Sequence, residues 1–360
     1  MTVRVAYICR GYPGLGKVMG ALTVHQRLSG RPDYHGLFLS YDRGHAYLSA
    51  ERYPCEDLLQ TGGQVARDSF CTPFAAETRF LMQRLADFEP TLIINDGEPY
   101  LIDITAELLG VPTLVLAHPL DLENPGNVHG VRLFRHYYRR ASTVVAHGLR
   151  RISPEAAALG ARAGQVEQIN TLVRESIWHA ARTVTVHDGP PVCVLGGGSS
   201  NAAGPFLERT IALGRWFLRA CADLAVGEGI VFCADERVHA ALASHAGPGV
   251  RLHDSPIDNT DALARASVVV GRAGRNLASE LLALGKRALL VPVSGARFRL
   301  SGQVQTANRA RELSSSVIAC HWDDGYPGFR AGLARLLETP ATPPHWRPGN
   351  DAIDALLPPG

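Results

Sequence analysis

Short apolar segments alternate with helix-length segments along most of this chain. Residues 3–8, 91–95 and 113–117 are rich in β-branched and aliphatic side chains, and segments with helical periodicity separate them. Buried strands that alternate with helices are typical of a parallel sheet with helices on both faces. This alternation predicts an α/β fold and leaves little room for an all-helical or all-β architecture.

The alternation stops over residues 171–191, which end in Asp188-Gly189-Pro190-Pro191, and then restarts with a strand at 192–195. We therefore expect two Rossmann-like, doubly wound parallel-sheet domains that face each other across a cleft, a usual place for ligands. The predicted boundaries are 1–170 for the N-terminal domain, 171–191 for a linker and 192–325 for the C-terminal domain. Residues 326–360 are expected to form a helix and a tail that pack back toward the N-terminal domain.

Composition excludes several classes of protein. The formal net charge is +2, which is too balanced for a nucleic-acid binder. Seven cysteines, an odd number without a Cys-x-x-Cys pair, predict reduced thiols and a cytoplasmic setting. The N-terminus leads directly into a strand without the long apolar region of a signal peptide, and no run is long enough to span a membrane.

The most informative local motif lies in residues 268–292. An apolar strand runs into a turn at Gly271 and Gly274, a helix follows and ends near Gly285, and a second buried strand comes next. The start of a helix offers unpaired N–H groups and a positive dipole end to an anion. Glu280, inside that helix, can accept hydrogen bonds from a ribose diol. The motif therefore predicts a nucleotide site.

Two glycine loops each follow a strand. The first contains Gly14-Leu15-Gly16-Lys17, and the second reads Gly196-Gly197-Gly198-Ser199-Ser200-Asn201. Glycines let the backbone approach a phosphate or an acceptor closely. The first loop misses the dinucleotide spacing by one position, and the second lacks the Gly-Lys-Ser/Thr ending of a P-loop, so we expect neither a dinucleotide site nor ATP hydrolysis.

Taken in order, these motifs resemble the GT-B glycosyltransferases, and most closely the MurG-like group, whose namesake transfers N-acetylglucosamine from UDP in peptidoglycan synthesis. The resemblance covers about residues 3–325. It rests on residues 14–22, on His118-Pro119-Leu120-Asp121 with Pro125-Gly126-Asn127, on Gly197-Gly198-Ser199, on Ile257-Asp258-Asn259, on Arg272-Ala273-Gly274 with Glu280, and on Gln305-Thr306-Ala307-Asn308.

The resemblance implies a UDP-sugar-dependent hexosyltransferase. It would move a sugar, such as that of UDP-GlcNAc, to a hydroxyl of a small-molecule or lipid-linked acceptor, with inversion and with neither a metal nor a cofactor beyond the cosubstrate. Residues expected at the donor are Gly198, Ser199, Ile257, Arg272, Gly274, Arg275, Asn276, Glu280, Gln305 and Asn308. Residues expected on the acceptor side are Gly14, Gly16, Asp121 and Asn127.

The base that takes the acceptor proton is predicted from position. Asp96 and His118 follow strands directly, at the carboxyl edge where ligands of such sheets bind. We rank them above Glu98, Asp121 and Glu123. Lys17 completes the predicted catalytic set, although it stands where the family usually has a histidine. A lysine can neutralise a diphosphate or an acidic acceptor, but it is a poor base.

Other functions stay open. Because Lys17 replaces the family histidine, a nucleotide-sugar hydrolase or epimerase on the same fold is an alternative, and so is a non-catalytic nucleotide-sugar binding protein. Arg132, Arg135 and Arg139 recur at helical spacing beside Tyr137 and Tyr138. They are either a solvated face or a surface for an anionic acceptor or lipid. Peripheral contact with the inner membrane face therefore stays open, as does the oligomeric state.

Overall fold

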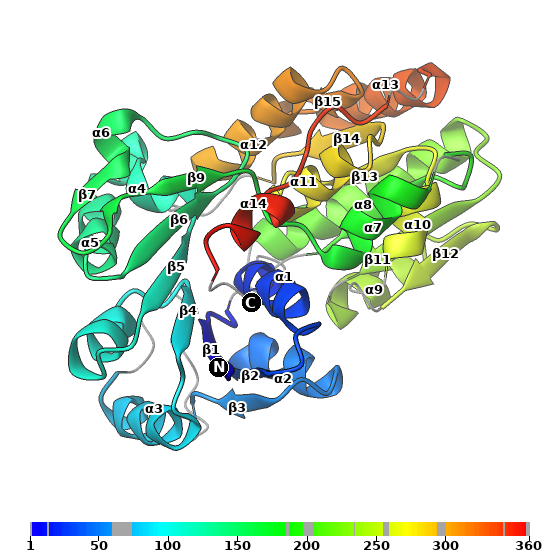
Figure 1. Cartoon of the computed structure of the whole chain (residues 1–360). Helices are drawn as coiled ribbons and strands as arrows, with labels where there is room; N and C mark the ends of the chain where they lie inside the picture. Colours follow the sequence, from blue (N-terminus) through cyan, green and yellow to red (C-terminus); the bar gives the residue numbers. More distant parts are fainter. Residues whose placement is uncertain are drawn as a thin grey trace. The chain divides into compact units, whose positions relative to one another are not determined.

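The computed structural model describes residues 2–12, 14–59, 74–184, 187–196, 205–233, 235–254, 259–293, 300–340 and 343–357. The chain divides into two compact units (Figure 1). Unit 1 comprises Met1–Leu172 and Gly349–Gly360, and unit 2 comprises Val173–Pro348. Each unit is described by itself.

Unit 1 is built on a parallel sheet. Its strands, in spatial order, are β3 (Cys55–Asp57), β2 (Tyr34–Ser40), β1 (Val3–Cys9), β4 (Leu92–Asp96), β5 (Thr113–Ala117), β6 (Thr143–His147) and β9 (Glu167–Ile169). The order reverses between β1 and β4, and ligands of such sheets bind outside the carboxyl ends of the strands at this point. A short antiparallel pair, β7 (Ala158–Gly160) and β8 (Gly164–Gln165), lies outside the sheet.

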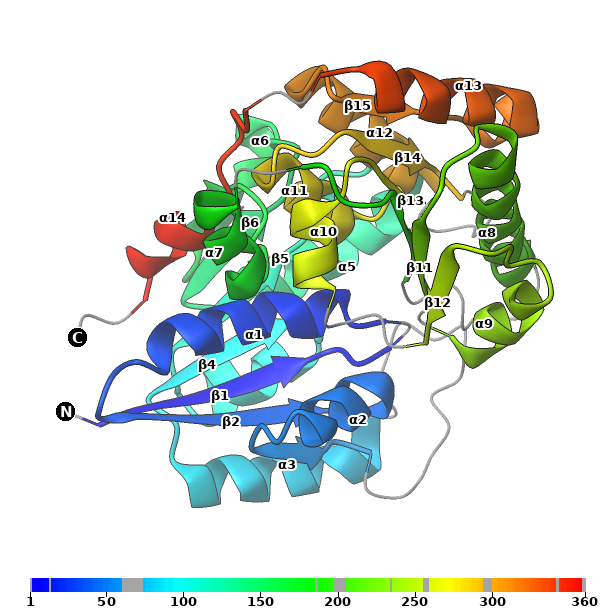
Figure 2. The ribbon, with the colours of Figure 1, turned by 90° about the vertical axis from the view of Figure 1, so that its right-hand side faces the viewer.

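Successive residues of each strand in unit 1 enter different cores. In β1, Val5, Tyr7 and Cys9 pack with α1 (Gly16–Leu28), which runs along that face of the sheet (Figure 2). Ala6 and Ile8 pack on the opposite face with α3 (Phe74–Phe88). The remaining helices are α2 (Asp42–Ala50), a π-helical segment η1 (Asp103–Leu108), α4 (Pro119–Leu122), η2 (Pro125–Asn127), α5 (Val128–Tyr138), α6 (Pro154–Ala157) and α14 (Asn350–Asp354).

The C-terminal segment belongs to unit 1. Helix α14 packs on α1, where Arg27 donates a 2.7 Å hydrogen bond from Nε to Asp354 Oδ1 and also pairs with Asp351 at 3.2 Å. Ile353 and Leu357 enter the same core as α1. Residues more than 300 positions apart in the sequence are thus joined by an apolar contact and by a charged one.

Unit 2 has a second parallel sheet. Its strands, in spatial order, are β12 (Val250–His253), β11 (Gly229–Cys233), β10 (Val192–Leu195), β13 (Val269–Arg272), β14 (Ala288–Val291) and β15 (Val317–Ala319). Its helices are α7 (Glu175–Thr183), α8 (Pro205–Asp223), α9 (Glu236–Ala243), α10 (Thr260–Arg265), α11 (Arg275–Ala283), α12 (Leu300–Leu313), η4 (Trp322–Asp324) and α13 (Gly325–Glu338). Helices α8, α9 and α13 share one core with the sheet. The strand order reverses between β10 and β13.

The two parallel sheets confirm the predicted α/β class and the doubly wound topology. The segment expected to be a linker, residues 171–191, contains α7, and its Gly189 pairs with Ala266 in an isolated bridge. A helix as short as α7 carries too few residues to show a clear period in the sequence.

Candidate functional site

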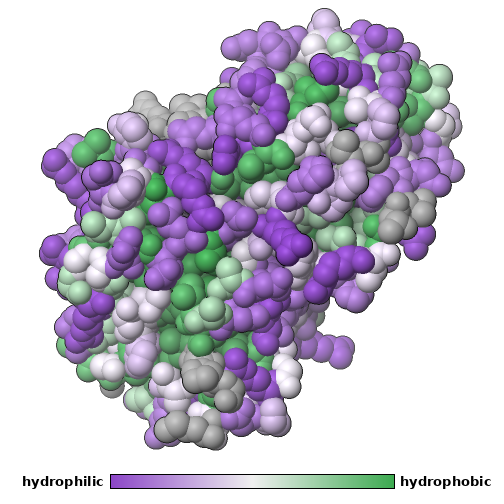
Figure 3. Space-filling model, turned by 45° about the horizontal axis from the view of Figure 1, so that its top comes forward, coloured by the Kyte–Doolittle hydropathy of each residue, from purple (hydrophilic) through white to green (hydrophobic). Residues whose placement is uncertain are grey.

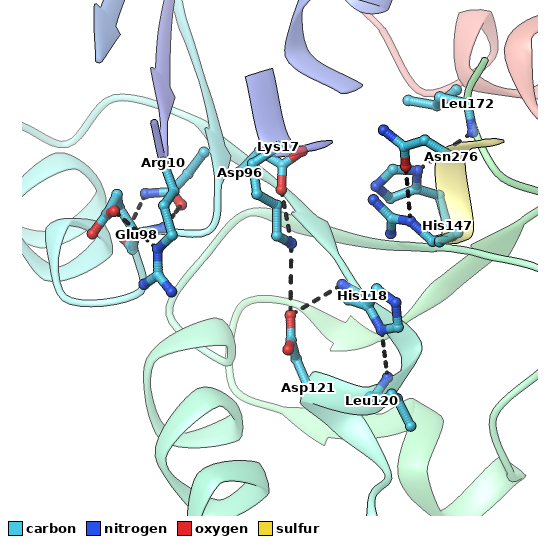
Figure 4. A network of polar contacts seen from close by, with 12 residues as sticks. Arg10, Lys17, Asp96, Glu98, His118, Leu120, Asp121, His147, Leu172 and Asn276 are labelled. Atoms are coloured by element: carbon cyan, nitrogen blue, oxygen red, sulfur yellow. Dashed lines mark hydrogen bonds and ion pairs between the residues drawn. The ribbon is translucent and has the colours of Figure 1, made fainter. Parts of the chain in front are cut away.

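Charged side chains gather at the carboxyl edge of the sheet in unit 1 (Figure 4). Lys17, in the first turn of α1, lies with Nζ 2.9 Å from Asp96 Oδ1, at the end of β4. The same nitrogen is 3.8 Å from Oδ2 of Asp121, which follows β5. Asp96 is fully buried, and only 11% of each of the other two side chains is exposed. Lys17 is therefore enclosed by two carboxylates.

Local backbone geometry makes this approach feasible. A Cβ on Gly20 of α1 would lie 2.8 Å from Asp96 Oδ2, so only glycine lets the helix come this close to the carboxylate. Gly97 follows Asp96 with φ of +98°, a conformation that favours glycine. The Asn95 side chain closes this turn, since its amide donates to the Glu98 carbonyl and its oxygen accepts from the Glu98 N–H.

A second buried ion pair lies at the same edge. Arg10, just after β1, donates from Nε to Glu98 Oε1 at 3.2 Å, and the Tyr41 hydroxyl donates to the same oxygen at 2.7 Å. Glu98 is 1% exposed. Because its carboxylate is buried and already bonded to two donors, Glu98 serves as the partner of Arg10 and has no surface toward a substrate.

His118 is held as the N-cap of α4. The ring nitrogen Nδ1 accepts a 3.0 Å hydrogen bond from the Leu120 N–H, and the backbone N–H of His118 donates to Asp121 Oδ2 at 3.1 Å. Because a backbone N–H can only donate, Nδ1 carries the lone pair, and the neutral ring carries its proton on Nε2. In this tautomer Nε2 of His118 donates a hydrogen bond and does not accept a proton.

Some of the site residues predicted in unit 1 thus lie in contact with one another. Lys17, Asp96 and Asp121 form one charged cluster, and His118 adjoins it through its backbone. Gly14 precedes α1, and Gly16 is its first residue. Asn127 is the N-cap of α5, where its side-chain oxygen accepts from the Gly130 N–H at 3.0 Å, so its observed contact is structural.

A buried arginine lies at the carboxyl edge of the sheet in unit 2. Arg272, the last residue of β13, is 6% exposed, and among the described residues it donates one long 3.3 Å hydrogen bond, from Nη1 to the Gly196 carbonyl. No carboxylate pairs with it among the described residues, and its Nε has no hydrogen-bond partner there. Burial lowers the pKa of Arg272 to about 10, so it is still a cation at neutral pH.

Helix α11 begins beside Arg272 without a side-chain cap. Gly274 is its N-cap residue, no acidic residue lies in the first turn, and the space where a Gly274 side chain would project is open for 4 Å. Arg275 and Asn276 form the first turn, and their side chains contact each other at 3.3 Å. A buried cation and the positive end of a helix dipole thus lie together at the reversal point between β10 and β13, an arrangement that favours an anion.

Glu280 pairs with an arginine that the sequence analysis missed. Arg174 donates from Nε to Glu280 Oε1 at 2.7 Å and from Nη2 to Oε2 at 2.9 Å, and Nη2 also donates to Asn259 Oδ1 at 2.8 Å. Only 9% of the Glu280 side chain is exposed. The only available signal was the position of Arg174 in the expected linker, and a single arginine in an arginine-rich chain carries little information.

The other predicted donor residues are less informative. Gly198, Ser199 and Ile257 lie outside the described residues. Gln305 and Asn308 are both half-buried on α12 and lie three residues apart, which places them on one helix face. Their predicted contact with the sugar stays a prediction.

In the parts of the chain that the structure describes, no group of three His, Cys, Asp or Glu side chains could hold a metal ion. None of the helices in those parts is long and apolar enough to cross a bilayer. The face drawn in Figure 3 is mostly hydrophilic, with smaller hydrophobic patches between the polar side chains.

Comparison with known proteins supports the fold. No family model and no curated protein sequence matches the chain. Among solved structures, MurG from Acinetobacter baumannii matches at 17% identity and a TM-score of 0.59, with 98% of each chain covered. UDP-GlcNAc 2-epimerase from Neisseria meningitidis, bound to UDP-GlcNAc, matches at 11% identity and 0.58, covering 98% of this chain and 99% of the epimerase.

The spinosyn rhamnosyltransferase SpnG matches at 13% identity and a TM-score of 0.59, with 98% of this chain and 94% of SpnG covered. At these identities the likeness establishes the fold alone. The chain has the GT-B fold, which it shares over nearly its whole length with glycosyltransferases and with UDP-GlcNAc 2-epimerases.

Proposed function

We propose that this GT-B chain is a glycosyltransferase that binds a nucleotide-sugar, UDP-GlcNAc being the first to test, and transfers the sugar to an acceptor hydroxyl with inversion and without a metal. The observation that carries the proposal is Arg272. Among the described residues no carboxylate pairs with this buried guanidinium, and a diphosphate would supply the negative charge. The positive end of the α11 dipole would favour the same anion.

A diphosphate bound at Arg272 would also fix where the ribose and the base of the nucleotide lie. A diphosphate at Arg272 and Gly274 places the ribose near the following helix, where Glu280 can accept from its hydroxyls. Arg174 holds both oxygens of that carboxylate and ties it to Asn259, at the start of α10. We infer that Arg174 fixes the orientation of Glu280 for the ribose. The base would then lie toward Asn259, as the resemblance implies for Ile257.

The direct test is turnover of UDP-GlcNAc by the purified full chain, with and without a panel of small-molecule and lipid-linked hydroxyl acceptors. Release of UDP that depends on an acceptor, together with a glycosylated product seen by mass spectrometry, is the expected result. Release without any acceptor would identify a hydrolase. A new 2-epimer in the NMR spectrum would identify an epimerase, which the fold comparison leaves equal in rank. UDP binding without turnover would identify a binding protein.

The donor site has its own test in the variant Arg272→Met. Charge-assisted hydrogen bonds contribute roughly 1.5–3 kcal/mol, so the Kd for UDP measured by calorimetry should rise by about ten- to a hundredfold. Arg265→Met removes the same charge from an exposed position on α10 and should leave the Kd within about twofold. Equal affinity in the two variants would exclude Arg272 from the diphosphate site.

Helix α5 is the surface that we propose for peripheral contact with an anionic membrane. Val128 and Leu133 are 49% and 36% exposed, and two exposed arginines lie nearby, Arg132 on the same helix and Arg139 as its C-cap. Arg135 is otherwise engaged, because it donates to the Ala156 and Ala158 carbonyls. Sedimentation with anionic vesicles, but not with neutral ones, is expected for the native chain and not for a variant with Arg132 and Arg139 changed to Gln.

A further inference from the structure

We propose that Asp121 is the general base that takes the proton from the acceptor hydroxyl. The proposal rests on the glycosyl transfer proposed above and replaces the ranking of His118 and Asp96 made from sequence position. Its basis is an asymmetry in the carboxylate: one oxygen of Asp121 is held by several donors, and the other is available to a substrate (Figure 4).

The contacts described for Asp121 all fall on Oδ2. The His118 N–H donates to it at 3.1 Å, the Tyr138 hydroxyl donates at 3.4 Å, and the Lys17 ammonium lies at 3.8 Å. Burial, followed by the charge of Asp121, raises the pKa of Tyr138 well above its usual value, so this hydroxyl keeps its proton and remains a donor. A backbone amide, a phenol and an ammonium thus fix the carboxylate from one side.

The second oxygen is the one that can react. Among the described residues no contact reaches Asp121 Oδ1, and 11% of the Asp121 side chain is exposed. Asp121 is 8% exposed, whereas Asp96 is completely buried beneath Lys17. A carboxylate held on one oxygen and accessible on the other has the geometry that proton abstraction requires.

The neighbouring candidates are less suited to the role. Lys17 is paired as an ammonium with two carboxylates, and an ammonium has no lone pair that could accept a proton. The neutral ring of His118 carries its proton on the outer nitrogen, because Nδ1 accepts from the Leu120 N–H. The Glu98 carboxylate is buried and paired with Arg10. Asp121 is the carboxylate of this cluster that combines fixation with access.

The proposed step transfers one proton and one glycosyl group. The O–H proton of the acceptor passes to Asp121 Oδ1 while the acceptor oxygen forms a bond to C1 of the sugar. The bond between C1 and the phosphate oxygen breaks, and its electron pair leaves with the nucleoside diphosphate. The acceptor is thereby glycosylated with inversion, and Asp121 later returns its proton to solvent. Lys17 and Tyr138 are positioning residues, since they act through the orientation of Asp121.

An acceptor without a proton isolates this role. Azide attacks C1 as an anion and needs no base, whereas an alcohol or water does. We would measure UDP release from UDP-GlcNAc with azide, and separately with the hydroxyl acceptor that the panel identifies or with water if it identifies none. For Asp121→Asn, which keeps an oxygen for the His118 N–H, we expect turnover of the hydroxyl acceptor to fall at least a hundredfold and azide turnover to stay within threefold.

The control is Glu123→Gln, two residues further on. Glu123 pairs with Arg150 at 3.0 Å and accepts from the Ser153 N–H, and its amide variant should keep both reactions within threefold. An equal loss of both reactions in Asp121→Asn would show a structural role and overturn the proposal, as would an unchanged hydroxyl reaction. If wild type binds UDP in calorimetry but turns over none of these acceptors, the donor site stands and the base assignment falls. Absence of UDP binding would instead refute the proposed function.

Discussion

Removing the ammonium of Lys17 is the most direct test of how the charged cluster in unit 1 is held together. In Lys17→Met the aliphatic part of the side chain is retained, and Asp96 loses its ion-pair partner. Because Asp96 is completely buried, no solvent can replace that partner. We expect the variant to fold with a lower free energy of unfolding of unit 1.

The magnitude follows from the two distances. With an effective dielectric constant of about 20, the attraction over 2.9 Å is about 6 kcal/mol, and over 3.8 Å it is about 4 kcal/mol. Desolvation offsets much of this attraction in the native protein. Removal of one partner alone typically costs about 3–5 kcal/mol because the other charge stays buried. Changing Asp96 to Asn in the same chain should recover at least half of that loss.

The assay is urea unfolding followed by two signals. All four tryptophans, Trp178, Trp216, Trp322 and Trp346, lie within unit 2, so their fluorescence reports that unit, whereas far-UV circular dichroism reports both. In Lys17→Met we expect the dichroism to fall at lower urea than the fluorescence changes. A loss below about 1 kcal/mol, or a double variant whose loss equals the sum of the two single losses, would refute the idea of an essential buried pair.

Three further predictions follow from single contacts. Gly20→Ala places a methyl group 2.8 Å from Asp96 Oδ2 and should lower the free energy of unfolding by about 1–3 kcal/mol, measured by urea titration, while Gly30→Ala, where nothing lies within 4 Å, should be nearly neutral. Burial, and then the charge of Arg287, lowers the pKa of Lys286 from 10.5 to about 7. Between these pH values the unfolded chain binds a proton that the native chain does not, so stability should rise with pH from about 7 to 10 in denaturant titrations, and Lys286→Met should flatten that rise. Glu280→Ala should weaken UDP binding in calorimetry by about ten- to a hundredfold and remove any preference for UDP over 2′-deoxy-UDP, whereas a retained preference would place the ribose elsewhere.

The sequence predicted which residues lie at the carboxyl edge of each sheet better than it predicted which side chains pair with each other. The ends of β4 and β13 were predicted to within two residues, because buried strands are short apolar runs; the structure extends these strands to Asp96 and Arg272. Pairings were not predictable, since they join residues from separate elements. Arg174 and Glu280 are 106 positions apart, and nothing in the sequence near either of them indicates the other.

The role proposed for Asp121 depends on contacts that sequence position does not reveal. Position after a strand ranks Asp96 and His118 first, but it cannot tell which carboxylate is covered by a lysine or which imidazole nitrogen accepts a backbone N–H. Those facts depend on the close packing of α1 against β4 and on the turn into α4. Topology therefore places a site, and side-chain packing decides which of its residues can react.

The two carboxyl edges differ in charge balance, and this difference favours a different ligand at each edge. In unit 1 the two cations Arg10 and Lys17 pair with three carboxylates, those of Asp96, Glu98 and Asp121. These five side chains therefore carry a net charge of −1 when all are ionised. An added diphosphate would meet repulsion there, which argues against Lys17 as a diphosphate ligand and favours a hydroxyl acceptor. In unit 2, Glu280 is neutralised by Arg174, while Arg272 has no acidic partner among the described residues. We therefore propose that the anion binds in unit 2 and that the proton acceptor lies in unit 1, which fits the glycosyl transfer proposed above.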